Sequence, residues 1–422
     1  MRDVFLRRQP VFTRRLEVWG YEISAGRFGI LEPGVLPVGQ PQAGPRPPVS
    51  GAPLPAPVLA DARLLFDALA EVGLPALVGD LPALLRLAPE TALAFAELLA
   101  ALAPLDRLLP VLALGPETDP ATLEAAFAAL QARGFRIGLT GDVCEPDLLS
   151  RARACDLVVL SARELSVDQL AERVAALRAG HARILVDDIE TYEWFDRCRE
   201  LHVSFFSGPF LAVPRPLRGA RPPSSRALLL LLARLQDPEV EFSELEALIS
   251  LDVGLTYRLL RLVNSVWYGR RRIESVRQAL LLLGTRLVSA WVTLLLMADV
   301  PEKPHELLTT AVVRARTAEL LAAARGRANR ESAFLVGLLS VLDALLDQPM
   351  EELLASLPLA EELRQALLTR EGELGLVLDA VLAYERGDWS RLVQLGLRPS
   401  LLTSSYLDAL ALAREIDSAL AA

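Results

Sequence analysis

Short apolar runs alternate with amphipathic segments of helical period through the first half of the chain. The runs have the length of strands and lie at 5–12, 17–23, within 74–87, and at 108–114, 136–139, 157–160, 183–186 and 205–206. The helical segments between them lie at 61–72, 89–102, 120–133, 147–154, 166–179 and 191–201. Short strands separated by helices predict βα units with a parallel sheet. This many units predict a TIM-like (β/α) barrel, in which chemistry lies at the carboxyl ends of the strands.

Only helical patterns follow the proline-rich stretch at 214–225. They lie at 226–235, 242–251, 253–263, 273–282, 285–298, 306–324, 331–346, 361–370, 375–386 and 401–421. The sequence therefore predicts a barrel over 1–213, a linker over 214–225 and an all-helical bundle over 226–422. Within the barrel, a stretch at 32–57 that is dense in proline and glycine is predicted to be a loop or disordered insert.

Composition and charge narrow the class of protein. Hydrophobic residues make up 52% of the 422 residues and charged ones 23%, which suits large folded cores. The net charge of -9 argues against a nucleic-acid binder, whose affinity depends on neutralising phosphates. No apolar run reaches the roughly 20 residues of a membrane span, and the first residues lack the apolar core of a signal peptide. We therefore expect a cytoplasmic protein without membrane insertion. The three cysteines lack C-x-x-C spacing and are predicted to be reduced packing residues.

Several segments resemble a known pair of bacterial signalling domains. Residues 8–12 and 18–23 resemble the opening of EAL-type cyclic-di-GMP phosphodiesterase domains. Residues 135–139 resemble the strand before that family's Asp-Asp pair, and residues 205–210 resemble its closing strand. The HDOD domain more closely resembles residues 259–265, 273–284, 333–340 and 383–389. The chain is identified as a member of the EAL-HDOD fusions. The resemblance implies an α/β plus all-α fold class, with an N-terminal EAL-type barrel and a C-terminal, HD-like helical bundle.

By the same resemblance, an active EAL domain holds two divalent metal ions with carboxylates, an Asn, a Lys and a Gln. Carried over position by position, the signature Glu matches Glu22 and the third Glu matches Asp187. The other positions hold different residue types: Arg86 for the Asn, Val111 or Ala113 for the second Glu, Thr140-Gly141 for the Asp pair, Val159 for the Lys and Ser207 for the Gln. Residues 1–263 contain no Asn and residues 1–302 no Lys, so realignment within the barrel restores neither.

The resemblance thus predicts a pseudoenzyme with no catalytic residues, no metal and no cofactor, because two carboxylates hardly hold two divalent ions. Its vestigial site positions are Glu22, Asp187, Ser207 and Gln9, the last as a nucleotide contact. Simpler alternatives remain open. Glu22 is also read as a solvated or capping carboxylate, Asp187 as part of an acidic run that caps the helix near Thr191, and Gln9 as a structural residue.

The helical half resembles an HD-type hydrolase that lacks the metal motif, since Ser340-Val341 occupies the place of the His-Asp pair. The histidines of the chain are scattered, which argues against a metal site. Arg270, Arg271 and Arg272 form a basic cluster that is either an interaction surface or a solvated turn between helices. A module for binding a protein partner remains.

Three functions are weighed on these grounds. The leading prediction is a non-catalytic signalling adaptor that binds protein partners, chiefly through the HDOD domain. The alternative is a receptor that binds cyclic-di-GMP or a related nucleotide without cleaving it and signals through the HDOD domain. An active cyclic-di-GMP phosphodiesterase is third. The sequence leaves the partner's identity and the oligomeric state open.

Overall fold

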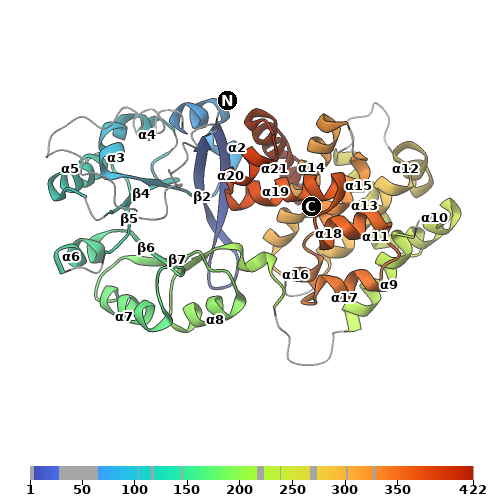
Figure 1. Cartoon of the computed structure of the whole chain (residues 1–422), viewed down its shortest axis with the longest axis horizontal. Coiled ribbons are helices and arrows are strands. Elements are labelled where there is room, and N and C mark those ends of the chain that lie inside the picture. The colour runs from blue at the N-terminus through green and yellow to red at the C-terminus, as the bar shows by residue number, and fades with distance from the viewer. Residues whose placement is uncertain are drawn as a thin grey trace. The chain divides into compact units, whose positions relative to one another are not determined.

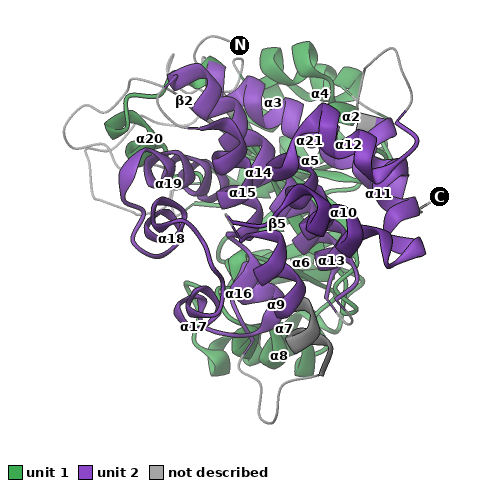
Figure 2. Cartoon of the chain, turned by 90° about the vertical axis from the view of Figure 1, so that its right-hand side faces the viewer, with its two compact units in different colours: residues 1–210, 387–400 green, residues 211–386, 401–422 purple. Residues whose placement is uncertain are grey.

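The computed structural model of the chain describes residues 4–27, 65–102, 104–115, 118–143, 146–215, 223–237, 239–266, 273–300, 303–326 and 329–421. The chain forms two compact units, residues 1–210 with 387–400 and residues 211–386 with 401–422 (Figure 2). Residues 387–400 thus belong to the barrel unit, although the sequence assigned them to the helical domain. The redirection begins at Gly387, whose φ of +73° ends a helix. The predicted insert at 32–57 lies outside the described residues.

The first unit contains a closed barrel with the strand order β1-β2-β3-β4-β5-β6-β7-β8 (Figure 1). The strands are β1 Val4–Phe12, β2 Val18–Arg27, β3 Ala83–Leu87, β4 Leu108–Ala113, β5 Gly138–Thr140, β6 Leu157–Ser161, β7 Arg183–Asp187 and β8 Phe205–Ser207. Strand β1 is antiparallel to both β2 and β8, and every other neighbouring pair is parallel. The predicted barrel is confirmed. Because β2 to β8 run in one direction, their carboxyl ends gather at one mouth of the barrel.

Helices separate the parallel strands. They are α2 Leu74–Val78, α3 Pro89–Ala94, α4 Ala96–Leu102, α5 Pro120–Gln131, α6 Pro146–Ala154, α7 Val167–Leu177 and α8 Tyr192–Glu200, with α20 Trp389–Gln394 from the returning segment. Residues 65–72, within the predicted 61–72 helix, are also helical. Asp119, Ser166 and Thr191 begin α5, α7 and α8 by accepting backbone N–H bonds. The predicted helix at 89–102 is divided in two at Phe95, and α2 and α20 were not predicted, since such short helices barely display a period.

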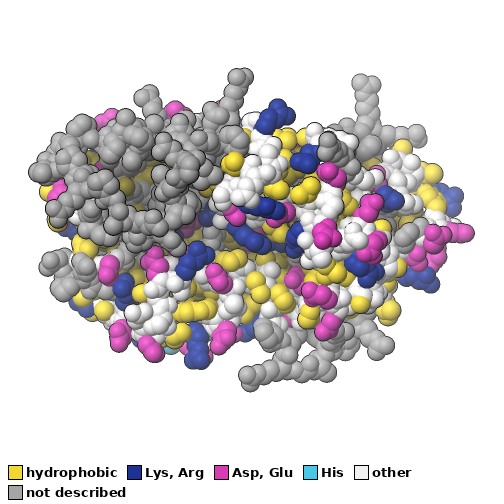
Figure 3. Space-filling view, in the orientation of Figure 1, with side chains coloured by type: hydrophobic (Ala, Val, Ile, Leu, Met, Phe, Trp, Pro, Cys, Tyr) yellow, Lys and Arg dark blue, Asp and Glu magenta, His cyan; other side chains and the backbone are white. Residues whose placement is uncertain are grey.

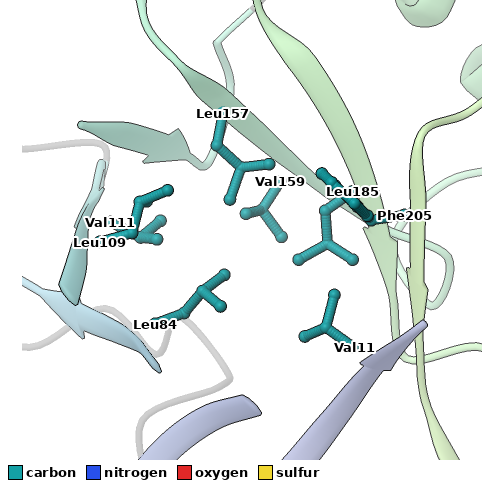
Figure 4. Close-up of a cluster of buried hydrophobic side chains, with 8 residues drawn as sticks. All are labelled: Val11, Leu84, Leu109, Val111, Leu157, Val159, Leu185 and Phe205. Carbon is teal, nitrogen blue, oxygen red and sulfur yellow. The ribbon is translucent and has the colours of Figure 1, made fainter. Parts of the chain in front are cut away.

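Apolar side chains from the strands fill the barrel interior (Figure 4). The buried members of this cluster point toward one another and are Val11, Leu84, Leu109, Val111, Leu157, Val159, Leu185 and Phe205. Trp19 packs against the cluster and stacks on Phe205 with ring centroids 4.2 Å apart. Val111 and Val159, which stand at positions where the family pattern has metal-site residues, are therefore part of the apolar core.

The second unit is built from α-helices, as predicted. They are α9 Pro223–Leu235, α10 Phe242–Ser250, α11 Val253–Val266, α12 Val276–Leu283, α13 Thr285–Ala298, α14 His305–Arg325, α15 Arg330–Leu339, α16 Leu342–Leu346, α17 Met350–Ala355, α18 Glu361–Leu368, α19 Gly372–Arg386 and α21 Pro399–Ala421. The predicted helix at 331–346 is two helices that separate at Ser340-Val341, and α17 was not predicted. At this break Ser340 forms a buried polar contact, described below.

Asn264 ties the end of α11 to the segment before α12. Its amide donates to the carbonyls of Leu260 at 2.6 Å and Ile273 at 2.8 Å, and its Oδ1 accepts the N–H of Ile273 at 2.9 Å. The two bonds to Ile273 satisfy backbone groups that lie outside any helix. The predicted interaction surface at Arg270, Arg271 and Arg272 lies outside the described residues.

Helices α14 and α15 approach closely at Gly337. A Cβ added there would lie 2.5 Å from Ala315 Cα and 2.6 Å from Ala315 N, both backbone atoms. We expect Gly337→Val to lower the free energy of unfolding by about 2 kcal/mol, because the helices must separate to admit the side chain. Urea unfolding measures the loss. Gly115→Val is the control, since a Cβ at Gly115 meets only Thr118 Oγ1 at 4.0 Å. Equal stability of the two variants would contradict the close packing.

Basic and acidic side chains are interspersed with hydrophobic ones on the described surface seen in Figure 3. No helix within the described residues combines the length and the apolar character that crossing a membrane requires. The cytoplasmic location and the absence of a nucleic-acid partner remain predictions of the sequence.

Candidate functional site

Polar side chains occupy the mouth of the barrel, next to the apolar cluster. In a strand, residues two apart face the same way, so the cluster members Leu84, Val159, Leu185 and Phe205 are each followed by a second inward-facing residue. Strands β1 and β2 contribute a cross-strand pair from the same end of the barrel. The resulting set is Gln9, Glu22, Arg86, Ser161, Asp187 and Ser207. Every one of these side chains can form hydrogen bonds, in contrast to the layer beneath.

Arg86 joins two carboxylates at this mouth. Its Nε lies 2.8 Å from Glu22 Oε1, and its Nη2 donates to Glu22 Oε2 at 2.9 Å and also to Asp187 Oδ2. Closure of the barrel brings these residues together from β3, β2 and β7. The side chain of Asp187 is 5% exposed, that of Glu22 15% and that of Arg86 33%. Among the described residues, Nη1 of Arg86 has no hydrogen-bond partner, so this end of the guanidinium has donors available to a ligand.

Burial raises the pKa of Asp187 to about 6, and the charges of Asp188 and Glu22 add to the rise against the opposing effect of Arg86. The Oδ1 atom of Asp187 is buried and has no hydrogen-bond partner within the described residues. Burial acts to lower the pKa of Arg86, but the charges of Glu22 and Asp187 outweigh it and raise that pKa. Arg86 therefore stays charged while Asp187 changes its protonation state just below neutral pH.

The other polar residues at the barrel mouth lie on the strands around Arg86, and two of them form hydrogen bonds to neighbouring strands or loops. Asp188 has a φ of +52°, which is uncommon for a residue other than glycine, and it accepts a hydrogen bond from Ser161 Oγ at 3.2 Å. Ser207 is fully buried and donates from Oγ to the carbonyl of Pro10 at 2.9 Å, which links β8 to β1. Gln9 lies directly across from Glu22 in the β1–β2 pair.

The geometry bears on the simpler alternatives for the two acids. Helix α8 is capped by the side chain of Thr191, which accepts the N–H of Trp194 at 3.3 Å. Asp187 is turned into the barrel instead, toward Arg86. Glu22 is also held by Arg86 rather than surrounded by water.

The residues present do not fit a two-metal centre. Divalent Mg²⁺ or Mn²⁺ prefers several oxygen ligands, mainly carboxylates. Here both carboxylates that the family pattern retains are bonded to one guanidinium, and Val111 and Val159 are buried in the apolar cluster. Asp142, one residue past the expected Asp pair, forms an ion pair with Arg173 at 3.1 Å. No group of His, Cys, Asp and Glu side chains suited to a metal ion occurs within the described parts of the chain.

A buried arginine in the helical unit contacts Ser340, which occupies the place of the lost His-Asp pair. Arg314 of α14 donates from Nε to Glu385 Oε2 at 2.6 Å and from Nη2 to Glu385 Oε1 at 2.7 Å. Its Nη1 donates to the carbonyl of Ser340 at 3.3 Å and to Ser340 Oγ at 3.2 Å. The side chain of Arg314 is only 7% exposed. This contact ties α14 to the end of α15 and to α19.

Sequence reasoning named Glu22 and Asp187 but missed what joins them. It treated Arg86 as a replaced ligand and Asp188 only as part of an acidic run that caps a helix, and it did not name Ser161 or Arg314. A signal was present for the two arginines, because each stands in an apolar stretch at a position that faces inward. A buried arginine requires an acidic partner.

Comparisons with known proteins place the helical half in a family. Residues 222–370 match the HDOD domain. A protein of Vibrio cholerae named "Cyclic di-GMP phosphodiesterase CdgJ" is 33% identical over 275 residues, which are 64% of each chain. The uncharacterized protein YuxH of Bacillus subtilis is 29% identical over 235 residues, 54% of this chain and 57% of its own. The chain thus spans less than two thirds of these relatives.

A solved structure from Bacillus subtilis was also found, the YkuI protein with an EAL domain, in complex with cyclic-di-GMP and calcium. It is 18% identical, with a TM-score of 0.39, over 63% of this chain and 68% of that one. The prediction of the EAL-HDOD pair is confirmed by the HDOD match and by the relative from Vibrio cholerae.

One prediction is contradicted by these findings, namely that the protein is not an enzyme. A relative 33% identical to the chain bears the name of a phosphodiesterase. The error has a physical reason. The missing carboxylates count against one arrangement of two metal ions, and they say nothing about a reaction supported by other groups at the same mouth. The prediction that the protein is a pseudoenzyme is therefore not supported.

Proposed function

Because the chain pairs an EAL-type barrel with an HDOD domain, we propose that it acts in cyclic-di-GMP signalling. In this proposal the barrel mouth receives the nucleotide, and the HDOD domain transmits the state of the barrel to a protein partner. The observation that carries it is the set of three charged groups, Glu22, Arg86 and Asp187, held at the carboxyl ends of the barrel strands. In a (β/α) barrel this is the end at which ligands bind.

Arg86 is the group proposed to meet the nucleotide. Two carboxylates fix the orientation of its guanidinium, so little side-chain entropy is lost when Nη1 donates to a phosphate oxygen. A planar guanidinium with free N–H groups is well suited to phosphate. Contact with the phosphodiester therefore needs no bound metal ion. The activity named for the Vibrio cholerae relative makes hydrolysis the reaction to measure alongside binding.

The test is calorimetric titration of the full chain with cyclic-di-GMP, with Mg²⁺ and with a chelator, followed by chromatography for the linear dinucleotide. We expect binding in both conditions and at least a tenfold loss of affinity in Arg86→Gln, with circular dichroism to verify folding. Arg163→Gln is the matched control, because Arg163 pairs with Glu190 at 3.4 Å in a solvent-exposed pair. Absence of binding at high ligand concentration would refute the nucleotide part of the proposal. Release of linear product would extend it to phosphodiesterase activity.

Binding is expected to strengthen as the pH falls from about 8 to about 6. The pKa of Asp187 is about 6, so its carboxylate goes from almost fully ionised to about half protonated over this interval. The phosphodiester then meets less negative charge, while the salt bridge to Glu22 still orients Arg86. Calorimetry in buffers of different ionisation enthalpy should show proton uptake on binding. Asp187→Asn should bind equally well at both pH values, and an unchanged pH dependence in that variant would rule out Asp187 as the titrating group.

A further inference from the structure

A groove in the second unit combines an apolar floor with a negatively charged rim. Its volume is about 260 Å³, and it is lined by Val263, Leu283, Leu287, Trp291, Arg316, Glu319, Phe334, Asp408, Ala411, Leu412 and Glu415. Trp291 and Phe334 pack with ring centroids 5.4 Å apart and form part of the floor. Both are almost fully buried, at 6% and 2% exposed. The floor is thus a rigid aromatic and aliphatic surface.

The rim carries three carboxylates and one guanidinium. Arg316 lies between two of the acids, with its Nε 2.8 Å from Asp408 Oδ1 and its Nη1 2.8 Å from Glu319 Oε2. Glu415 adds the third carboxylate on the α21 side. Glu319 also pairs with Arg330, which lies outside the groove, at 3.3 Å. With Arg330 included, three carboxylates face two guanidinium groups, and the net charge is minus one. A negatively charged nucleotide is disfavoured here, and a basic group is favoured.

One wall of the groove is a single face of α21. Asp408, Ala411, Leu412 and Glu415 follow one another at the spacing that places residues on the same side of a helix. This helix lies outside residues 222–370, which match the HDOD domain. The groove is therefore a feature that α21 completes, and the HDOD segment alone lacks one of its walls.

From the size and the charge of this groove, we propose that it binds a helical segment of a partner protein that presents an arginine or lysine beside leucine-like side chains. The volume falls below the roughly 300–1,000 Å³ of pockets that hold small molecules, and it suits one or two anchoring side chains. The apolar side chain packs on the more exposed Leu283, Leu287 and Leu412, which line the groove with Trp291 and Phe334, and the basic group reaches Asp408, which is 49% exposed. The proposal rests on the partner-binding role given to the HDOD domain above and names the chemistry of that partner.

The test uses a fluorescent amphipathic peptide of about 15 residues, or four helical turns, with leucine and arginine along one face. The full chain is titrated into the peptide and anisotropy is followed. Two further peptides replace arginine with glutamate or leucine with serine. We expect only the leucine-arginine peptide to bind, with affinity that falls as salt rises. Equal binding of the arginine-serine peptide would indicate attraction to the acidic chain as a whole and would overturn the proposal.

Two variants of the chain locate the site. Asp408→Lys reverses the charge of the rim, and Ala411→Trp fills the groove without a change of charge; each should weaken peptide binding at least tenfold. Glu331→Lys is the charge-matched control on an exposed residue outside the groove and should bind like the unaltered chain. Unchanged binding in both groove variants would refute the site, as would self-association of the chain that is blocked by Ala411→Trp. Titration with cyclic-di-GMP should be unaffected by these variants, so failure of the nucleotide site and failure of the groove are told apart.

Discussion

Glu385→Ala should lower the free energy of unfolding by about 3–5 kcal/mol, because it leaves the guanidinium of Arg314 buried without its carboxylate. Arg314 makes both of its short bonds to that carboxylate, at 2.6 and 2.7 Å, and is 7% exposed. Its contacts to Ser340, at 3.2 and 3.3 Å, are longer and involve neutral acceptors. Chemical denaturation of the full chain, followed by circular dichroism, measures the loss.

The two members of the Arg314–Glu385 pair differ in exposure, and this difference gives a more specific test. Glu385 is 37% exposed, so after Arg314→Met its carboxylate still has access to water and the loss should be smaller. The double variant Arg314→Met/Glu385→Ala should be more stable than Glu385→Ala alone. The control is Asp299→Ala, which breaks a bidentate pair with Arg258 in which both side chains are solvent-accessible, 32% and 50% exposed. There the loss should stay below about 1 kcal/mol. A Glu385→Ala variant as stable as Asp299→Ala would show that Arg314 does not depend on its carboxylate.

The sequence was sufficient for the parts of the fold that have a long period. Alternation or helical spacing becomes visible only in elements of sufficient length, such as strands β4, β6 and β7 and helices α13 and α14. Helices α2, α17 and α20 are five or six residues long and were missed. The return of 387–400 to the barrel unit was also missed, because it depends on tertiary packing after the turn at Gly387 and no local pattern encodes it.

Only part of the candidate site could be predicted from the sequence, for a related reason. Position-by-position comparison tests only whether each residue is able to replace a metal ligand, and an arginine such as Arg86 is not. Such a comparison does not show which charged side chains come into contact when the barrel closes. Arg86 and Asp187 are 101 positions apart, and Arg314 and Glu385 are 71 apart. Neither pairing follows from spacing along the chain. Arg86 stands where the family pattern has a metal ligand, and Arg314 contacts Ser340 in the place of the lost His-Asp pair. Comparison along the sequence showed only that the ligands are missing at these places.

Arg86→Met should destabilise the barrel by about 3–5 kcal/mol at about pH 8, because two carboxylates that face one guanidinium are left without it. Glu22 and Asp187 are 15% and 5% exposed, so water replaces little of the lost interaction. Urea unfolding of the full chain, followed by circular dichroism, measures the change. Arg163→Met is the control, since it removes an exposed pair at 3.4 Å and should cost less than about 1 kcal/mol.

The loss in Arg86→Met should also depend on pH, and the sign follows from Asp187. Its pKa rises from 3.8 in the unfolded chain to about 6 in the fold, so the folded state binds the proton more tightly. This contribution, about 3 kcal/mol, is fully present below about pH 4 and is lost as the pH rises through about 6. Removal of Arg86 takes away a charge that lowers this pKa, so the window moves upward and the variant loses more stability at pH 8 than at pH 5. Addition of Asp187→Asn to Arg86→Met should restore part of the stability at pH 8 and little at pH 5. A loss that is the same at both pH values would mean that the charge of Asp187 is not what Arg86 offsets.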